Sequence, residues 1–197
     1  MQVTLYNRKH KPRVEIRSDI VELAKKMGIK HSGEVFITSN PSINNAFVNL
    51  YTKKITMSES WLKQFHKTEV AATIGHEFGH IKGQKRFTYE MLSIFFASFA
   101  FMVCFSLATI LLRLVFIPIF LQISTLTLMM LLLSLVLWRN EYRADMYGAL
   151  ATGPEPLIAV FEGLQGTLLS KGKKDQGSET HPPFYARIKR LKSLLSE

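Results

Sequence analysis

Hydrophobic and polar positions divide this chain into a long apolar middle and two mixed flanks. Between Met91 and Trp138 the only charged side chain is Arg113. So much uncharged sequence is too long for the centre of a small domain, which argues against a pair of buried core helices. The pattern therefore predicts a polar domain that is interrupted by a membrane insert.

The apolar stretch is long enough for two membrane-spanning helices. A helix rises about 1.5 Å per residue and the hydrocarbon core of a bilayer is about 30 Å thick, so about 20 residues cross it. We expect spans at residues 89–112 and 114–138. Residues 113–118 form the turn between them, because Arg113 can extend to the interface and Pro118 disfavours a continuous helix.

The charged residues beside the spans predict their orientation. Basic residues stand outside both outer ends: Lys82, Lys85, Arg86, Arg139 and Arg143. The turn carries Arg113 alone. The positive-inside rule then places both termini and the polar domain in the cytoplasm, with the spans in the cell (inner) membrane. The first ten residues contain no apolar core of signal-peptide length, so we expect the internal spans to direct membrane insertion.

The flanks show the periods of short helices and strands. Helices are expected at residues 18–27, 58–66, 67–83, 139 to beyond 149, 156–170 and 185–195. Strands are expected at 34–38, 46–51 and 54–57, with a turn at 39–42 and a mobile polar loop at 171–180. The predicted fold class is α+β, mostly helical with a small β-sheet. A transmembrane hairpin at 89–138 interrupts the domain and divides it into residues 1–88 and 139–197.

Composition narrows the class of partner. The chain of 197 residues has a formal net charge of +10, and its single cysteine, Cys104, excludes an intrachain disulfide. A basic surface suits either nucleic acid or anionic lipid. Because a membrane insert is present and no nucleic-acid motif is found, we expect membrane lipids as partners and no nucleic acid.

Candidate metal chemistry lies in the helix before the first span. His76, Glu77 and His80 form the pattern H-E-x-x-H. Residues four apart share one face of a helix, so both imidazoles can bind a single metal ion. The glutamate can then take a proton from a metal-bound water, whose pKa zinc lowers to about 7. Gly75 and Gly79 are poor helix formers, but such small residues permit close packing.

A catalytic zinc site needs a third protein ligand, and no further histidine stands at the spacing H-E-x-x-H-x-x-G-x-x-H. Glu141 is the acidic candidate. Asp145 lies four residues later on the same helical face, where it can accept a hydrogen bond from a ligand imidazole. An even number of spans returns the chain to the side it left. The hairpin is therefore expected to bring Glu141 beside His76 and His80 at the membrane surface.

Four ordered motifs resemble those of the HtpX-type membrane zinc metalloproteases, which are related to the CAAX prenyl proteases. The motifs are Asn45-Ala46-Phe47 with the strand and helix that follow, His76 to His80, Glu141 to Asp145, and Thr180-His181-Pro182-Pro183 with Arg187-Ile188. The resemblance covers most of the chain from about residue 34 onward. The sequence has no counterpart of the two further spans that usually precede the catalytic domain in such proteins.

The resemblance implies a zincin-like metalloprotease domain that cleaves membrane or unfolded proteins, as in membrane protein quality control. It also implies one Zn²⁺ per chain. The ligands would be His76, His80 and Glu141, and Glu77 would be the general base.

The resemblance assigns roles to two further groups of residues. His181 would stabilise the tetrahedral oxyanion, a suitable task for a cationic donor, and Arg187 would give either transition-state or structural support. The strand that contains Asn45, Ala46 and Phe47 would bind an extended protein or peptide substrate by β-augmentation.

A non-catalytic membrane adaptor that keeps the metalloprotease fold is the alternative function. All the catalytic residue types are present, which favours the enzyme. An intramembrane protease would need the H-E-x-x-H inside an apolar span, and nearby charges such as Lys63, Lys82 and Lys85 argue against that. The membrane-anchored zinc endopeptidase is therefore the preferred hypothesis.

Overall fold

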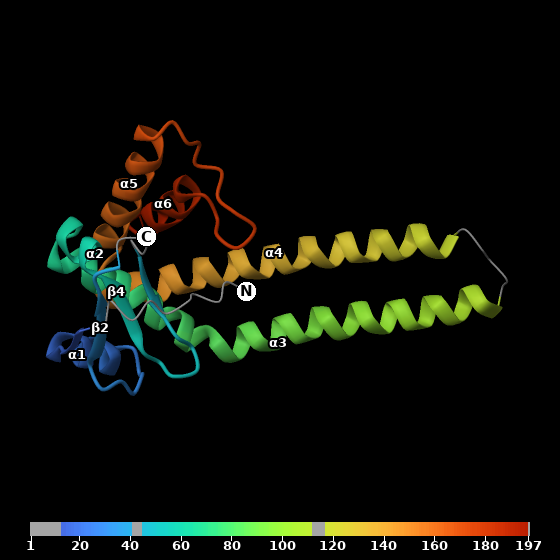
Figure 1. Ribbon diagram of the computed structural model, residues 1–197, viewed down its shortest axis with the longest axis horizontal. Coiled ribbons are helices and arrows are strands. Elements are labelled where there is room, and N and C mark those ends of the chain that lie inside the picture. The colour runs from blue at the N-terminus through green and yellow to red at the C-terminus, as the bar shows by residue number, and fades with distance from the viewer. Residues whose placement is uncertain (1–12, 41–44, 112–116, 197) are drawn as a thin grey trace.

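The computed structural model describes residues 13–40, 45–111 and 117–196. A polar domain lies at one end, and two long helices run side by side away from it (Figure 1). The elements follow in the order β1 (Arg13–Ile16), α1 (Ser18–Lys26), β2 (Glu34–Thr38), β3 (Ala46–Val48), β4 (Ile55–Ser58), α2 (Glu59–Gln64), α3 (Lys67–Leu111), α4 (Ile117–Thr152), α5 (Pro154–Ser170) and α6 (Phe184–Ser193). The predicted fold class, mostly helical with a small sheet, is confirmed.

The sheet places β3 at one edge, in the strand order β1-β2-β4-β3. β2 runs parallel to β4, whereas β1 and β3 are antiparallel to their neighbours. Alternate residues of a strand point to one face, so Val35 and Ile37 of β2 form a buried row with Ile55 and Met57 of β4. Ala46 of β3 extends this row beside Met57. The edge strand thereby contacts α3.

The sheet differs from the sequence-based expectation in two places. β3 ends at Val48 rather than at residue 51, because the side chain of Asn49 accepts hydrogen bonds from the backbone N–H groups of Tyr51 and Thr52 and starts a turn. The sequence pattern missed β1, a strand of four residues that pairs with β2. Residues 41 and 42 of the expected turn lie outside the described residues.

The two longest helices are continuous. α3 contains the helix expected at 67–83 and the first expected span, and α4 contains the second span and the helix expected from Arg139. Both helices therefore continue through residues 88 and 138. Pro118 lies in the first turn of α4, where its missing N–H interrupts no helical hydrogen bond. Arg113, in the expected turn, lies outside the described residues.

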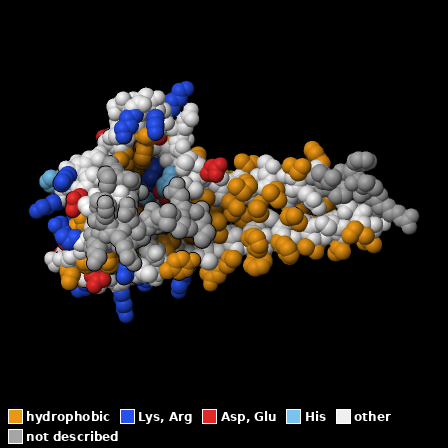
Figure 2. All heavy atoms as spheres, in the orientation of Figure 1, with side chains coloured by type: hydrophobic (Ala, Val, Ile, Leu, Met, Phe, Trp, Pro, Cys, Tyr) orange, Lys and Arg blue, Asp and Glu red, His pale blue; other side chains and the backbone are white. Residues whose placement is uncertain are grey.

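Beyond the polar domain, both helices expose apolar side chains. Each is long and apolar enough to cross a membrane, and 6% of its most apolar window is buried. Phe95, Phe99 and Leu131 are more than half exposed. Figure 2 shows hydrophobic side chains gathered along the projecting pair. Such exposure is contrary to the alternative of two buried core helices.

Inside the polar domain, α3 and α4 cross through small residues. Gly75 and Gly79 of α3 face Gly148 and Ala144 of α4. A Cβ atom added at Gly79 would lie 2.6 Å from the Ala144 backbone, and one added at Gly148 would lie 2.8 Å from the backbone nitrogen of His76. Such an approach requires residues without a Cβ atom. We call this contact of Gly75 and Gly79 with Gly148 and Ala144 the glycine seam. It sets the position of α4 along its own axis relative to the H-E-x-x-H turn.

Candidate metal centre and active site

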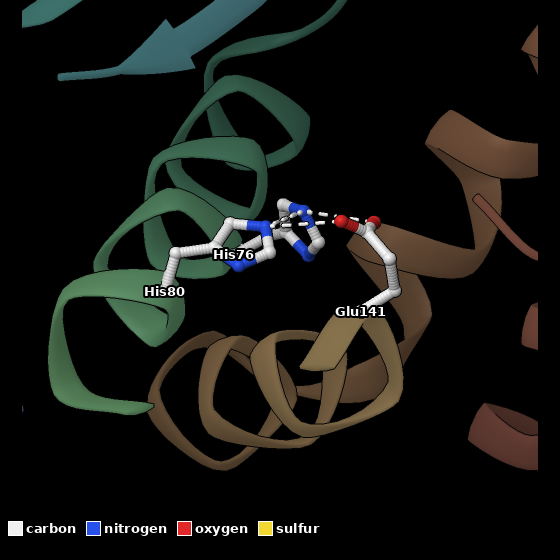
Figure 3. Close-up of side chains that lie close together, drawn as sticks. All are labelled: His76, His80 and Glu141. Atoms are coloured by element: carbon white, nitrogen blue, oxygen red, sulfur yellow. Dashed lines mark hydrogen bonds and ion pairs between the residues drawn. The ribbon is translucent and has the colours of Figure 1, made fainter. Parts of the chain in front are cut away.

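Three potential ligands converge where α3 meets α4. His76 and His80 come from successive turns of α3, and Glu141 comes from α4 (Figure 3). One ligand atom from each residue lies within 4.8 Å of the others. The Nε2 atoms of the two histidines are 3.1 Å apart. The carboxylate of Glu141 lies 3.7 Å from Nε2 of His76 and 3.4 Å from Nε2 of His80.

These distances fit a tetrahedral zinc ion. Zinc bonds of about 2.0–2.2 Å place neighbouring ligand atoms about 3.3–3.6 Å apart. Among the described residues, Oε2 of Glu141 is a buried oxygen without a hydrogen-bond partner, although Arg187 Nη1 lies 3.3 Å away. A buried carboxylate oxygen needs a compensating donor or cation. Two imidazoles and one carboxylate are a ligand set that leaves a fourth position open for water or substrate.

Asp145 and Arg187 support the ligands from behind. Nδ1 of His76 lies 2.8 Å from Asp145, which also accepts two hydrogen bonds, of 2.8 and 2.6 Å, from Arg187. Burial alone would raise the pKa of Asp145, but Arg187 and His76 outweigh it and lower that pKa to about 2. The carboxylate therefore stays charged and fixes the orientation of the His76 ring, with Nε2 towards the other ligands.

His80 is held in the neutral form that binds metals. Burial and the adjacent His76 keep the pKa of His80 well below its usual value. The side-chain amide of Asn140 contacts Nδ1 of His80 at 3.0 Å. The amide nitrogen faces the ring here; with the amide turned so that its oxygen faces the ring, Asn140 accepts a hydrogen bond from Nδ1–H and leaves Nε2 free for a ligand bond. Sequence reasoning missed Asn140. Asn140 lies four residues before Ala144, on the face of α4 that contacts α3, and this spacing could have indicated that its side chain faces His80.

Glu77 lies between the ligands and the edge of the sheet. Its side chain is buried, and Oε2 accepts a hydrogen bond of 2.9 Å from the backbone N–H of Val48 in β3. Burial raises the pKa of Glu77 to about 7, although the charge of His76 and the Val48 hydrogen bond act in the opposite direction. A carboxylate with a pKa near neutrality suits proton transfer in either direction. No residue pattern indicated the Val48 contact in advance.

A cleft of about 500 Å³ opens onto these residues. Its walls come from β3, the H-E-x-x-H turn, α5 and the segment that leads into α6. Apolar side chains of α5 form one wall: Leu157, Val160, Phe161, Leu164 and Leu168. Asn45, Ala46 and Phe47 line the opposite side, with Ala46 buried and the other two exposed. A mostly apolar cleft with a few polar groups at its base is typical of a substrate site.

His181 reaches the cleft from the loop before α6. Its side chain is 60% exposed, and Nε2 lies 3.7 Å from Glu141. Nδ1 is 2.7 Å from the hydroxyl of Thr180, which fixes the ring orientation. Arg187 differs, because it is 4% exposed and packs over the ring of Phe161 while it bridges two carboxylates. Both residues line the cleft, His181 at its mouth and Arg187 at its base.

The loop that carries His181 makes several contacts with the rest of the polar domain. Asp175 accepts hydrogen bonds from the backbone N–H groups of Phe184 and Tyr185 at the start of α6. The indole N–H of Trp138 donates to the carbonyl of Ser178 across 2.9 Å. The loop is thus connected to α6 and to the turn of α4 that contains Trp138.

An H-E-x-x-H helix, a facing glutamate and an adjacent sheet edge define a metalloprotease type of site. Residues 10–195 match the family described as Peptidase family M48. The chain therefore belongs to peptidase family M48. This confirms the predicted relationship with the HtpX and CAAX prenyl proteases.

Two relatives show how far the likeness extends. The crystal structure of S. mikatae Ste24p matches with a TM-score of 0.61 at 19% identity, over 96% of this chain and 53% of that chain. At this identity the likeness shows the fold alone. A CAAX prenyl protease 1 homolog from Dictyostelium discoideum is 31% identical over an alignment of 74 residues, and the match covers 34% of this chain and 17% of that protein. The chain thus spans about half of one relative and a smaller part of the other.

Proposed function

We propose that this protein is a membrane-anchored zinc endopeptidase that cleaves membrane or unfolded proteins, in membrane protein quality control. One Zn²⁺ per chain would be held by His76, His80 and Glu141. The observation that carries the proposal is the spacing of the three ligand atoms. Family membership supports a peptidase that uses a metal ion.

The chemistry follows from the groups around the ligands. Zinc would polarise the scissile carbonyl and lower the pKa of a water molecule to about 7. Glu77 takes a proton from the attacking water and passes it to the leaving amine, and its raised pKa favours both transfers. His181 at the mouth of the cleft donates to the developing oxyanion. Arg187 gives structural support, because its ion pairs with Glu141 and Asp145 hold these two carboxylates in place.

The edge strand β3 provides the substrate platform in this proposal. Asn45 and Asn49 bond to β4 through their backbones, so the alternating pattern turns the backbone groups of Ala46 and Val48 outwards. An extended peptide can pair with the outward carbonyl groups, and with the N–H of Ala46 in exchange for its present hydrogen bond to the side chain of Asn45. Glu77 already occupies the N–H of Val48, which places the base beside the bound peptide.

The membrane anchor is proposed from the two exposed apolar helices. By the positive-inside rule, the protein lies in the cell (inner) membrane with residues 1–88 and 139–197 in the cytoplasm and 89–138 as the hairpin. The Trp138–Ser178 contact links the cytoplasmic end of the second span to the loop that carries His181. This position supports substrates that approach along the membrane surface.

Replacement of the base tests the proposal against a non-catalytic adaptor. Wild-type and Glu77→Gln proteins are purified in detergent, loaded with zinc and mixed with casein. We expect one zinc per chain in both, and cleavage by the wild type at least 100-fold faster, because general-base catalysis contributes about 10²–10⁴-fold. Equal cleavage by both would remove Glu77 from the mechanism. One bound zinc with no cleavage by either protein would favour the adaptor.

A further inference from the structure

A second groove, of about 830 Å³, lies between α3 and α4 where they leave the polar domain. It shares no lining residue with the active-site cleft. Its mouth is polar and includes Lys85, Tyr89 and Arg139. Its other end is apolar and includes Ile94 and Leu132. We call it the hairpin groove.

On both helices, the side chains that line the groove change from charged to apolar with distance from the polar domain. On α3 it runs from Lys85 to Ile94, which is about 13 Å along a helix. On α4 it runs from Arg139 back to Leu132, about 10 Å. Because the two helices are antiparallel, their charged ends meet at the polar domain and their apolar ends point towards the hairpin tip (Figure 1). The groove therefore has one cationic end and one hydrocarbon-like end.

The charges at the mouth are not balanced within the chain. Glu90, a charged residue near the start of the expected first span, pairs with Arg143 at 2.5 Å and with Arg86 at 3.1 Å. In the parts of the chain that the structure describes, Lys85 and Arg139 have no ion pair and no side-chain hydrogen bond with another residue. These two cations stand at the level where the helices would meet the lipid headgroups. Glu90 also lines the groove, but it pairs with Arg143 and Arg86, so the mouth keeps an excess of positive charge that favours an anion from outside the chain.

We propose that the hairpin groove binds one anionic phospholipid. Its phosphate lies between Lys85 and Arg139, and an acyl chain lies along Ile94, Leu132 and Leu135. The charge complementarity at the mouth and the apolar end together select an anionic amphiphile, because a free anion would leave the apolar end uncovered and a zwitterionic lipid would neutralise the cations less completely. The proposal rests on the membrane anchor of the proposed function.

Native mass spectrometry of the full chain in detergent tests this site. Phosphatidylglycerol and phosphatidylcholine of the same chain length are titrated separately. We expect one retained phosphatidylglycerol per chain and at least tenfold weaker retention of phosphatidylcholine. The double variant Lys85→Gln/Arg139→Gln should bind phosphatidylglycerol about 30-fold more weakly, the sum for two cations near an anionic lipid. Lys85→Arg/Arg139→Lys keeps both charges and should restore binding.

A matched control separates the groove from general surface charge. Lys30→Gln/Lys63→Gln removes the same charge from exposed positions on the polar domain and should leave lipid binding unchanged. Equal retention of the two lipids, an equal loss in this control, or displacement of the lipid by millimolar glycerol phosphate would overturn the proposal. Cross-linking of Tyr89 to a second copy of the chain, with no lipid retained in the groove, would also overturn the proposal. Casein cleavage and resistance to alkaline extraction, measured on the same samples, report the proposed function independently.

Discussion

The α3–α4 pair has two halves of opposite composition. The inner half, residues 67–88 and 139–152, lies in the polar domain, and the outer half, residues 89–111 and 117–138, projects from it. In the inner half, the helices touch backbone to backbone through the glycine seam, as at Gly79 and Ala144. In the outer half, the same helices carry large apolar side chains such as Phe95, Phe99 and Leu131, and these are mostly exposed. Helical backbone continues unbroken through both halves.

The difference shows that side-chain size determines what each half of the helix pair does. Small residues let the inner half pack closely, and large apolar residues give the outer half an exposed apolar surface. Close approach in the inner half fixes the relative height of the two helices, so that Glu141 faces His76 and His80. The outer half contributes little to this geometry, because its side chains turn away from the chain's own core. We therefore expect substitutions in the inner half to disturb folding and metal binding, and those in the outer half to disturb neither.

The largest contrast is expected between two phenylalanines of α3. Phe78 is fully buried, whereas Phe99 is 58% exposed. Phe78→Ala should lower the free energy of unfolding by about 3–5 kcal/mol through the cavity that it leaves. Phe99→Ala should change it by no more than about 0.5 kcal/mol in detergent. Chemical denaturation of both variants, followed by circular dichroism, measures this. A comparable loss for Phe99 would mean that the outer half is packed against a partner.

A single methyl group tests the glycine seam next. Gly79→Ala places a Cβ atom 2.6 Å from the Ala144 backbone, which cannot move without displacing α4. Overpacking of this kind costs about 1–3 kcal/mol, and the displaced Glu141 should also weaken zinc binding. Gly166→Ala is the control, because nothing lies within 4 Å of the added Cβ atom and alanine favours the helix by up to about 1 kcal/mol. Zinc stoichiometry and melting temperature distinguish the two. Unaltered zinc binding in Gly79→Ala would show that the seam does not position Glu141.

Much of the site could be predicted because its residues follow local helical spacing. His76 and His80 are four residues apart, and so are Glu141 and Asp145, so their faces follow from the period of a helix. The distance between the two pairs followed from topology, since a hairpin returns the chain to its starting side. Gly75 and Gly79 also indicated close packing, which the structure places against α4.

The contacts that were missed depend on long-range backbone positions. Val48 reaches Glu77 only because β3 is the edge strand and lies against α3, and an N–H group has no sequence signature. Asn140 looked like an ordinary interface residue until its partner His80 was placed. The sequence predicted separate helices and spans at 67–83, 89–112, 114–138 and from 139, whereas α3 and α4 each join two of them, because the polar residues between them favour a helix as much as the apolar ones.

The smallest predicted effect compares two buried or partly buried acids that each pair with an arginine. Asp145 supports His76 in the inner half, and Glu90 pairs with Arg143 at the start of the outer half. Asp145→Asn should weaken zinc binding about 10–100-fold, the usual range for a group that orients a ligand imidazole. Glu90→Gln should leave zinc affinity unchanged. Competition with a fluorescent zinc chelator measures both, and equal affinities in the two variants would reduce Asp145 to a structural ion pair.

The pH dependence of stability gives Asp145→Asn a second readout in metal-free protein. Arg187 and His76 lower the pKa of Asp145 to about 2 in the folded state, against about 3.9 in an unfolded chain. A lowered carboxyl pKa stabilises the folded state fully above the unfolded value, and this stabilisation is lost as the pH falls through the folded value. The melting temperature of the variant should therefore lie below that of the wild type at pH 6, and the gap should narrow between about pH 4 and pH 2. A gap that does not change with pH would mean that the charge of Asp145 does not stabilise the inner half.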